Sequence, residues 1–412
     1  MPQDYYQSRE FFRRKKRIKL GLERPRIVGE TSVLTTFLQY FTKTSLKAFT
    51  KAGCETFLLI DDQVDVTDDM RRKVLDEFRP DIYYLVSHSR VGSTLPKAVS
   101  VISYVQDCCG PMTTKERIDN LIQPSDLFIC QADGFKKYLT DKKVPEEQIM
   151  TEPVPVDHEK FFPAPLDFER DVVLVNHAYK PPQEMMDLFM TTHFGGKQSD
   201  KMRKFFEVLL AWLMCRDYVS EKEFTDHVFK KLMVFADNSA TVQWRQLLHV
   251  FYVTVYYAYW REMIIKKLLK SGVKLEIYGN NWQGFDIPED IIKGDYCDEE
   301  KRNELYNTSK VVLQLNPQMT MHQRVVEVAL AGGLLVGVDL PEKDDWCQAK
   351  KYMGYTYFYP VNELAEKIKE LILRREKGEL EVELECNHRE AFRNHSAEVV
   401  VHKILDKWRE LL

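Results

Sequence analysis

The sequence predicts an α/β protein built from two doubly wound, Rossmann-like domains, with a helical insertion in the second domain. Three observations lead to this fold class. Short apolar runs typical of buried strands alternate with helical patterns along most of the chain. A segment with four prolines at 152–165 interrupts this alternation and resembles a stiff interdomain connection. The 412 residues suffice for two domains, each with its own core.

The first domain is expected at 26–150, after a basic leader at 1–25. Apolar runs predict its strands at 27–28, 56–60, 82–86, 96–105 and 127–130. Apolar residues at helical spacing predict its helices at 35–52, 68–78 and 134–139. Gly53 is expected to end the first of these helices, because glycine accepts a positive φ.

A linker is expected at 151–168, the second domain at 169–392 and a final helix within 393–412. Strands are predicted at 172–179, 273–278, 310–315, 334–338 and 356–359. Helices are predicted at 205–215, 221–235, 242–268, 361–377 and 398–411. The first three helices form an insertion at about 183–262 that separates the first two strands of this domain. Its aromatic cluster, Tyr252, Tyr256, Tyr257 and Trp260, is typical of core packing rather than of a sugar-stacking surface.

Composition narrows the class of protein. A net charge of −4 does not favour nucleic acid as a partner. Eight cysteines occur without CxxC spacing, so a cysteine metal site is not predicted and reduced, buried thiols are expected. No secretory signal is recognised, and the apolar run at 247–260 is too short to span a membrane. We therefore expect a cytoplasmic protein.

The leader at 1–25 is strongly basic, with apolar residues among its lysines and arginines. It is interpreted either as a solvated helix or arm, or as an arm that contacts a partner or the inner face of an anionic membrane.

The segment Ser309 to Asp339 carries the strongest functional pattern. It predicts a strand, a polar loop, a short helix, the pair Gly332-Gly333 and a second strand. Ligands of open α/β sheets bind at the carboxyl ends of strands and the N-termini of helices. The segment could hold a nucleotide: Arg324 is a candidate for its phosphate and Glu327 for its ribose hydroxyls, or the two form an intrahelical ion pair.

Other residues at predicted strand ends complete the candidate site. The expected nucleotide contacts, or alternatively simple turn residues, are Tyr278, Gly279, Asn280, Asn316, His322 and Gln323. In the first domain, His88 and Asp107 each follow a predicted strand and are the candidate catalytic residues. Their alternative roles are a structural histidine and a helix cap.

Several motifs, taken together in order, resemble those of CgeB-like, spore-maturation-type glycosyltransferases, which have the GT-B fold. The stretches that carry this resemblance are LTTFLQY at 34–40, RPDI at 79–82, VDHEKFFP at 156–163, GVKLEIYGNNW at 272–282, EEKRNELYNTSKVVLQL at 299–315, RVVEVALAGG at 324–333 and NH at 394–395. The resemblance implies that a sugar moves from a nucleotide donor, a UDP-sugar by expectation, to a protein or glycan acceptor. It implies no cofactor and no metal, a donor held by the second domain and an acceptor held by the first, with the reaction in the cleft between them.

Two departures from the family pattern keep other functions open. Many retaining GT-B enzymes carry a Glu-x7-Glu pair; Glu327 matches its second member, but Met319 stands where the first would be. No R-x4-K phosphate pair is evident. A catalytically weak sugar-nucleotide binder or assembly protein, or a sugar-nucleotide epimerase, therefore remains an alternative.

Overall fold

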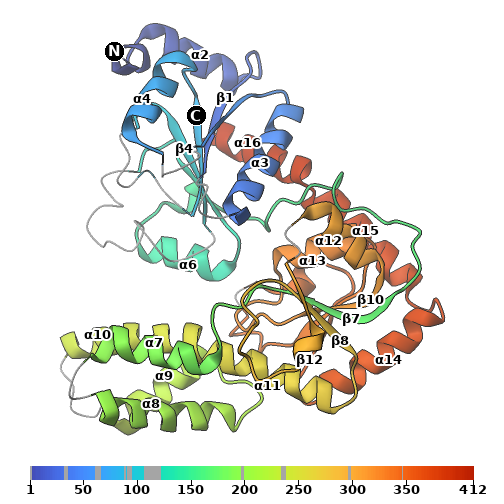
Figure 1. Ribbon diagram of the computed structural model, residues 1–412. Helices are drawn as coiled ribbons and strands as arrows, with labels where there is room; N and C mark the ends of the chain where they lie inside the picture. Colours follow the sequence, from blue (N-terminus) through green and yellow to red (C-terminus); the bar gives the residue numbers. More distant parts are fainter. Residues whose placement is uncertain are drawn as a thin grey trace. The chain divides into compact units, whose positions relative to one another are not determined.

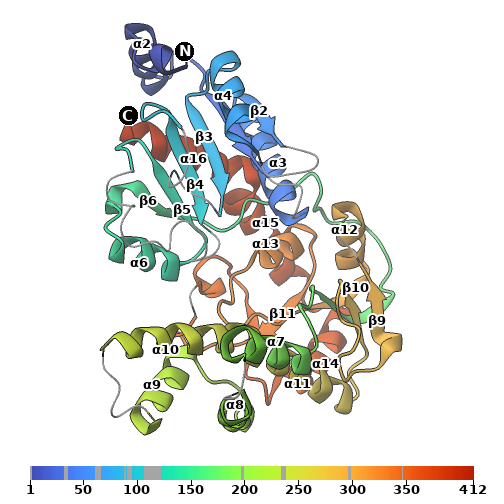
Figure 2. The ribbon, with the colours of Figure 1, turned by 60° about the vertical axis from the view of Figure 1, so that its left-hand side comes forward.

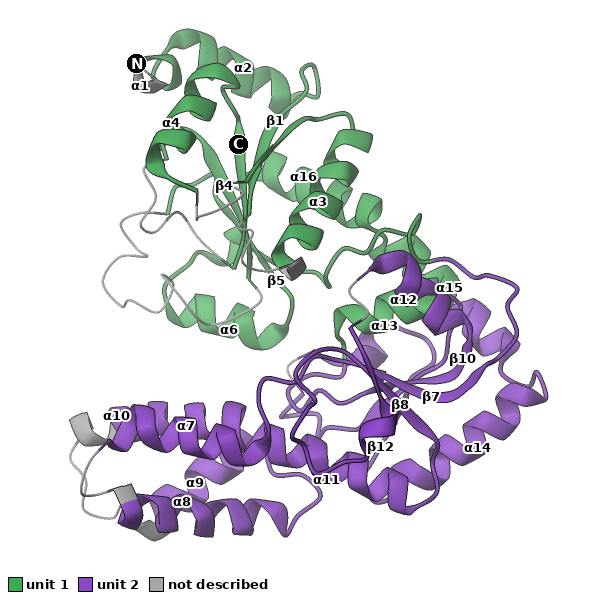
Figure 3. Cartoon of the chain, viewed as in Figure 1, with its two compact units in different colours: residues 1–161, 321–330, 388–412 green, residues 162–320, 331–387 purple. Residues whose placement is uncertain are grey.

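The computed structural model describes residues 2–31, 36–60, 66–87, 90, 95–105, 122–195, 199–232, 238–295, 298–345 and 347–412. The chain forms two compact units (Figure 3): residues 1–161, 321–330 and 388–412 make the first, and residues 162–320 and 331–387 make the second. The change from one unit to the other after Phe161 falls inside the predicted proline-rich linker. Residues 321–330 return to the first unit, although they lie in the sequence between two strands of the second.

The first unit contains a parallel sheet of six strands in the order β2-β1-β3-β4-β5-β6. Its strands are β1 (Arg26–Glu30), β2 (Glu55–Leu59), β3 (Ile82–Val86), β4 (Ser100–Val105), β5 (Leu127–Cys130) and β6 (Ile149–Thr151). Every residue of β3, β4 and β5 is buried, as expected for strands covered on both faces. The strand predicted from residue 96 begins only at Ser100, because Pro96–Val99 form a turn.

Helices cover both faces of this sheet (Figures 1 and 2). They are α1 (Pro2–Tyr6), α2 (Arg9–Lys19), α3 (Thr36–Lys51), α4 (Asp68–Glu77), α6 (Asp133–Asp141) and α16 (Ala397–Leu411). Alternate residues of β3 belong to different cores. Ile82 and Tyr84 pack with α3 and α16, whereas Tyr83 and Leu85 pack with α1 and α4. The period-2 alternation of a strand therefore separates two cores on the two sides of one sheet.

The basic leader is part of the first unit. Phe11 and Ile18 of α2 are fully buried. Arg14 is also buried, and its Nη2 lies 2.9 Å from Oδ2 of Asp81, which precedes β3. The expectation of a solvated arm is thus wrong for this face of α2, because apolar side chains and one ion pair fix the helix to the domain.

The second unit has a six-stranded parallel sheet in the order β12-β11-β10-β7-β8-β9. Its strands are β7 (Arg170–Val175), β8 (Leu275–Tyr278), β9 (Ile292–Gly294), β10 (Ser309–Gln314), β11 (Leu335–Val338) and β12 (Tyr357–Tyr359). Its helices outside the insertion are α12 (Glu299–Asn307) and α14 (Leu364–Glu376). Helix α13 (Gln323–Leu330) belongs to the first unit, and α15 (Glu381–His395) is divided between the two units. Counted within this sheet, the order is the 3-2-1-4-5-6 arrangement of dinucleotide-binding domains.

The predicted insertion between the first two strands of this sheet is entirely helical where it is described. It comprises α7 (Pro182–Phe194), α8 (Ser199–Met214), α9 (Glu221–Leu232), α10 (Asn238–Phe251), a π-helical turn (Tyr252–Tyr256) and α11 (Tyr257–Lys270). Helices α7 to α10 lie beside one another in Figure 1, and their aromatic residues join the core of the second sheet. The core-packing interpretation of the tyrosine cluster is confirmed.

The sequence patterns did not predict helices α7, α12 and α15 or strands β6 and β9. The two strands have three residues each, too few for a periodic signal. Among the described cysteines, the expectation of buried thiols is confirmed for Cys54, Cys130 and Cys347 and is wrong for Cys215, which is exposed. No described helix has the length and apolar character that a membrane span requires.

Candidate functional site

The order of the second sheet indicates where a ligand binds. From β7 the sheet continues to β8 and β9 on one side, and from β10 to β11 and β12 on the other. The chain therefore leaves β7 and β10 toward opposite sides, and the loops after these neighbouring strands separate at the carboxyl edge of the sheet. Open α/β sheets bind ligands at such a switch point. The loops at 176–181 and 315–322 are those that follow the two strands.

The loops that follow β7 and β8 are locked together by hydrogen bonds. The amide of Asn176 donates to the carbonyl of Tyr278 over 2.8 Å, and the amide of Ala178 donates to the carbonyl of Asn280 over 3.0 Å. In return, the amide of Asn280 donates to Nδ1 of His177 over 2.9 Å. The Asn280 side chain remains exposed. The two loops are thus joined by backbone hydrogen bonds, and Asn280 presents an exposed amide side chain.

Gly279 makes this close approach possible. Its φ is +136°, and a Cβ atom built there would lie 2.2 Å from the carbonyl oxygen of Asn176. The same oxygen accepts a 2.6 Å hydrogen bond from Nε1 of the buried Trp282. The close approach that only glycine permits at this position is to the neighbouring loop. A contact of Gly279 with a nucleotide stays a prediction.

Tyr278 contributes its backbone to this edge, whereas its hydroxyl is engaged elsewhere. The hydroxyl donates to Oε2 of Glu276 over 2.6 Å and accepts from Nε of Arg170 over 3.0 Å. Burial raises the pKa of Tyr278 to about 12, so the hydroxyl is protonated at neutral pH. The structure thus gives this hydroxyl a role in fixing the strand end.

The loop after β10 is shaped by its own side chains. Oδ1 of Asn316 accepts a 3.0 Å hydrogen bond from the amide of Gln318. Further along, Asp345 accepts from both the amide and the hydroxyl of Thr320, over 3.0 and 2.6 Å. Burial raises the pKa of Asp345 above its usual value. Thr320 and Asp345 were not predicted as residues of the site. The carboxylate of Asp345, which follows the predicted strand at 334–338, could have indicated them.

Helix α13 carries four of the predicted residues at or near its start and belongs to the first unit. Glu327 is only 4% exposed, and its Oε1 accepts a 2.7 Å hydrogen bond from Nε2 of the buried Gln323. The amide of Arg324 donates to Nδ1 of His322 over 3.3 Å. Nε of Arg324 is buried and has no hydrogen-bond partner within the described parts of the chain. A buried carboxylate and a guanidinium with an unused donor therefore lie one turn apart on the same helix.

The two candidate catalytic residues of the first unit, His88 and Asp107, lie outside the described residues. Of the strands that precede them, β3 ends at Val86 and is followed by Ser87 with a φ of +57°, and β4 ends at Val105. The structure thus confirms the strands but does not describe the two side chains.

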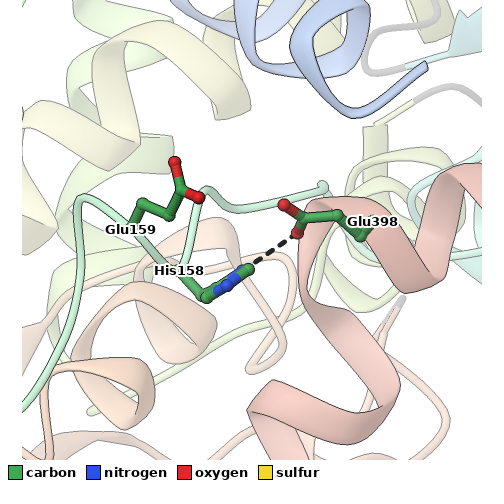
Figure 4. Close-up of side chains that lie close together, drawn as sticks. All are labelled: His158, Glu159 and Glu398. Atoms are coloured by element: carbon green, nitrogen blue, oxygen red, sulfur yellow. Dashed lines mark ion pairs between the residues drawn. The ribbon is translucent and has the colours of Figure 1, made fainter. Parts of the chain in front are cut away.

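One cluster within the described ranges has the composition of a metal site. Ligand atoms of His158, Glu159 and Glu398 lie within 4.8 Å of one another (Figure 4), and Nδ1 of His158 is 2.9 Å from Glu398. Nζ of Lys51 lies 2.5 Å from Glu159 and 2.7 Å from Glu398. Hydrogen bonds from Lys47 and Lys51 lower the pKa of Glu159 to about 2. The ammonium groups already supply the positive charge, so this cluster does not fit a bound cation.

Comparison with known proteins shows which family model and which solved structures this chain resembles. Residues 261–406 match the sequence model of a family described as "Glycosyl transferase-like". The chain is similar to a glycosyltransferase from Rickettsia africae ESF-5, with 11% identity, a TM-score of 0.54, and 94% of this chain and 99% of that chain covered. The chain has the GT-B fold. It is also similar to the sucrose-phosphate synthase of Thermosynechococcus elongatus, with 10% identity, a TM-score of 0.50, and coverage of 94% and 99%. No curated protein sequence matches the chain.

The family match begins in α11 and contains the segment from Ser309 to Asp339. It therefore covers both the loop after β8, with Gly279, and the strand-loop-helix segment. The helical insertion, apart from most of α11, and the whole of the first sheet lie outside the matched residues.

Proposed function

We propose that this GT-B protein is a glycosyltransferase that moves a sugar from a nucleotide-sugar donor to a protein or glycan acceptor. The observation that carries the proposal is the family match over 261–406, because it contains the loops after β8 and β10 of the 3-2-1-4-5-6 sheet. Nucleotides bind at the switch point of such sheets. The motifs at 272–282, 299–315 and 324–333 support a CgeB-like enzyme within this class.

The donor is proposed to bind at the carboxyl edge of the second sheet, with a UDP-sugar as the first candidate. Asn280 and Asn316 supply amide groups after β8 and β10, the two strands that flank β7. On α13, Glu327 has the chemistry to accept hydrogen bonds from ribose hydroxyls. Arg324, with an unused Nε donor, has the chemistry to neutralise phosphate charge as the nucleotide leaves. His322 and Gln323 at the start of α13 are proposed as further phosphate contacts.

Transfer requires that the acceptor hydroxyl lose a proton as the new glycosidic bond forms. His88 and Asp107 are the proposed groups for this role or for contacts to the transferred sugar, because each follows a strand of the acceptor-side sheet. The guanidinium of Arg324 is proposed to stabilise the leaving nucleotide, so the reaction is proposed to need no metal ion and no cofactor.

A second candidate function rests on one residue. Met319 stands where many retaining GT-B enzymes carry the first glutamate of a pair, and it is buried. A thioether cannot replace the hydrogen bonds that a carboxylate makes to a sugar hydroxyl. A sugar-nucleotide binder or assembly protein of low activity, or an epimerase, is therefore the alternative.

The outer face of α2 suggests where the protein meets a partner or the inner surface of a membrane. Phe12 is 58% exposed, and basic residues surround it on the exposed side: Arg13, Lys16, Arg17 and Lys19. Cationic and aromatic side chains together favour anionic lipid headgroups. Sedimentation with phosphatidylserine vesicles tests this contact. Binding should fall when Phe12, Lys16 and Arg17 are replaced by serine, and unchanged binding would exclude the contact.

Nucleotide release separates the candidate functions. Purified protein is incubated with UDP-, GDP-, ADP- and dTDP-sugars, and the free nucleotide and the sugar are both followed. Slow release of one nucleotide, accelerated by an acceptor, is expected for a transferase. Binding without turnover supports the binder, and sugar conversion without release supports the epimerase. Glu366→Ala, on the exposed face of α14, serves as the control variant.

A further inference from the structure

Residues of the helical insertion and of two strand-end loops line an open pocket in the second unit. Its volume is about 430 Å³. Its lining residues come from the segment before α9 and from α9 itself, from α10 to the start of α11, and from two loops: Pro317 and Gln318 after β10, and Lys343 and Asp344 after β11. Sites for small ligands typically have volumes of about 300–1,000 Å³. The pocket therefore has room for one or two sugar rings.

Three tyrosines line this pocket, and one of them has an unsatisfied hydroxyl. The Tyr252 hydroxyl donates to the carbonyl of Val219 over 2.5 Å, and the Tyr218 hydroxyl donates to the carbonyl of Pro317 over 3.4 Å. Tyr257 is 9% exposed, and its buried hydroxyl has no hydrogen-bond partner within the described residues. A buried hydroxyl without a partner costs free energy. A ligand with hydroxyl groups is the natural partner for it.

A π-helical turn places Tyr252 and Tyr257 beside the same pocket. In a regular α-helix, residues five positions apart point about 140° away from each other. The turn at Tyr252–Tyr256 is π-helical, so its hydrogen bonds link residues five apart. Tyr252 and Tyr257 consequently line the same pocket, with ring centroids 5.2 Å apart in an edge-to-face arrangement. Single π turns inside helices often occur at functional sites.

The charges around the pocket are balanced. Three basic and three acidic side chains line it: Lys222, Arg245, Lys343, Glu221, Asp226 and Asp344. Lys222 pairs with Asp226 at 2.6 Å, and Glu221 lies 2.9 Å from His249. A strongly anionic ligand such as a nucleoside diphosphate gains no net attraction here. A neutral ligand rich in hydroxyls can use both the donors and the acceptors.

We propose that this pocket binds a neutral saccharide, as a subsite for the glycan part of the acceptor. The wall residues Pro317 and Gln318 directly follow Asn316, which is proposed to face the donor. A saccharide held here would thus lie against the loop of the donor site. The existence of the saccharide site does not depend on the proposed function, but its assignment to the acceptor rests on it.

Saturation-transfer NMR with free sugars tests the proposal. The probes are glucose, galactose, N-acetylglucosamine, lactose, cellobiose and chitobiose, each up to about 10 mM, which detects even weak millimolar binding. Tyr257→Phe removes only the unsatisfied hydroxyl. Gln318→Ala removes the amide of a half-buried lining side chain in the loop after β10. Tyr256→Phe is the matched control, since Tyr256 is a neighbouring buried tyrosine that does not line the pocket. UDP affinity is measured on every variant by calorimetry.

We expect at least one sugar to bind, and both Tyr257→Phe and Gln318→Ala to weaken its binding about tenfold, equivalent to about 1.4 kcal/mol. Tyr256→Phe should bind the sugar normally, and UDP affinity should not change in any variant. The proposal would be wrong if none of the six sugars bound. It would also be wrong if the two tyrosine variants weakened sugar binding equally while Gln318→Ala bound the sugar normally. If sugars bind but no nucleotide does, the proposed transferase fails while the saccharide site stands.

Discussion

Gly279→Ala tests whether the edge of the second sheet depends on the contact between its loops. The new methyl group would lie 2.2 Å from the Asn176 oxygen, whereas ordinary contacts begin at 3.4 Å, so the two loops must separate by the difference, 1.2 Å. That shift is large enough to break the hydrogen bond from Trp282 Nε1 to the same oxygen, now 2.6 Å long. The perturbation therefore combines backbone strain with the loss of a buried hydrogen bond.

The expected magnitude follows from these two contributions. A positive φ costs alanine about 1–2 kcal/mol, and a buried donor left without its partner costs about 1–3 kcal/mol. Together they predict a loss of about 2–5 kcal/mol in the free energy of unfolding. Gly272→Ala isolates the first contribution, because Gly272 also has a positive φ, +81°, but nothing lies within 4 Å of the added Cβ.

Urea denaturation followed by tryptophan fluorescence measures both variants, and calorimetry with UDP measures the state of the site. Gly279→Ala should unfold at lower urea than Gly272→Ala and should lose UDP affinity, whereas Gly272→Ala should bind UDP normally. If the two variants unfold at the same urea concentration, the loops move apart without cost and the reasoning about their contact is wrong.

Three further predictions concern single charged residues. Arg14→Met leaves Asp81 buried without its ion pair and should lower the free energy of unfolding by about 3 kcal/mol in urea denaturation. The hydrogen bond that protonated His249 donates to Glu221 raises the pKa of His249 above 6.5. This pair therefore stabilises the folded state below that pH, and the contribution disappears as pH rises through the raised pKa. Glu221→Gln should therefore destabilise the protein by a few tenths of a kcal/mol near about pH 6 and not near about pH 9, because both side chains are partly exposed. Glu327→Ala should weaken nucleotide binding at least about tenfold, or about 1.4 kcal/mol, measured by calorimetry.

Each of these predictions has a control and a contrary outcome. Arg13→Ala, on the exposed face of α2, should leave stability unchanged; equal stability of the Arg14 and Arg13 variants would mean that the leader does not support the domain. A destabilisation of Glu221→Gln that is the same at both pH values would assign it to lost packing rather than to charge. Normal UDP affinity in a folded Glu327→Ala protein would remove that carboxylate from the donor site.

Much of the fold followed from local patterns in the sequence. The apolar run at 82–86 became β3 with the same bounds, and the run at 310–315 became β10 with a shift of one residue. Fully buried parallel strands are recognisable because nearly every residue is apolar. The strand order was not predictable in this way, since it depends on pairing between segments more than a hundred residues apart, such as β7 with β10.

In the candidate site, too, the sequence indicated which residues are involved, and the structure decided which partners they have. The sequence identified Glu327 and Arg324 by their spacing and left open an ion pair between them. In the structure, Gln323, four residues before Glu327, donates to the carboxylate instead. Spacings of three and four residues both place side chains on one helix face, so periodicity alone does not choose between the two partners.

By itself, the sequence determined that this protein has two domains of the α/β class, a helical insertion and a strand-loop-helix segment suited to a nucleotide. These features depend on hydrophobic periodicity and on turn residues, which are local properties. Only the tertiary structure decided that the leader packs on the first domain, that Gly279 faces the Asn176 carbonyl and that the insertion lines a pocket with an unsatisfied Tyr257 hydroxyl. Each of these depends on which distant atoms meet, and the hydrogen bonds and contacts that fix them form only when the chain has folded.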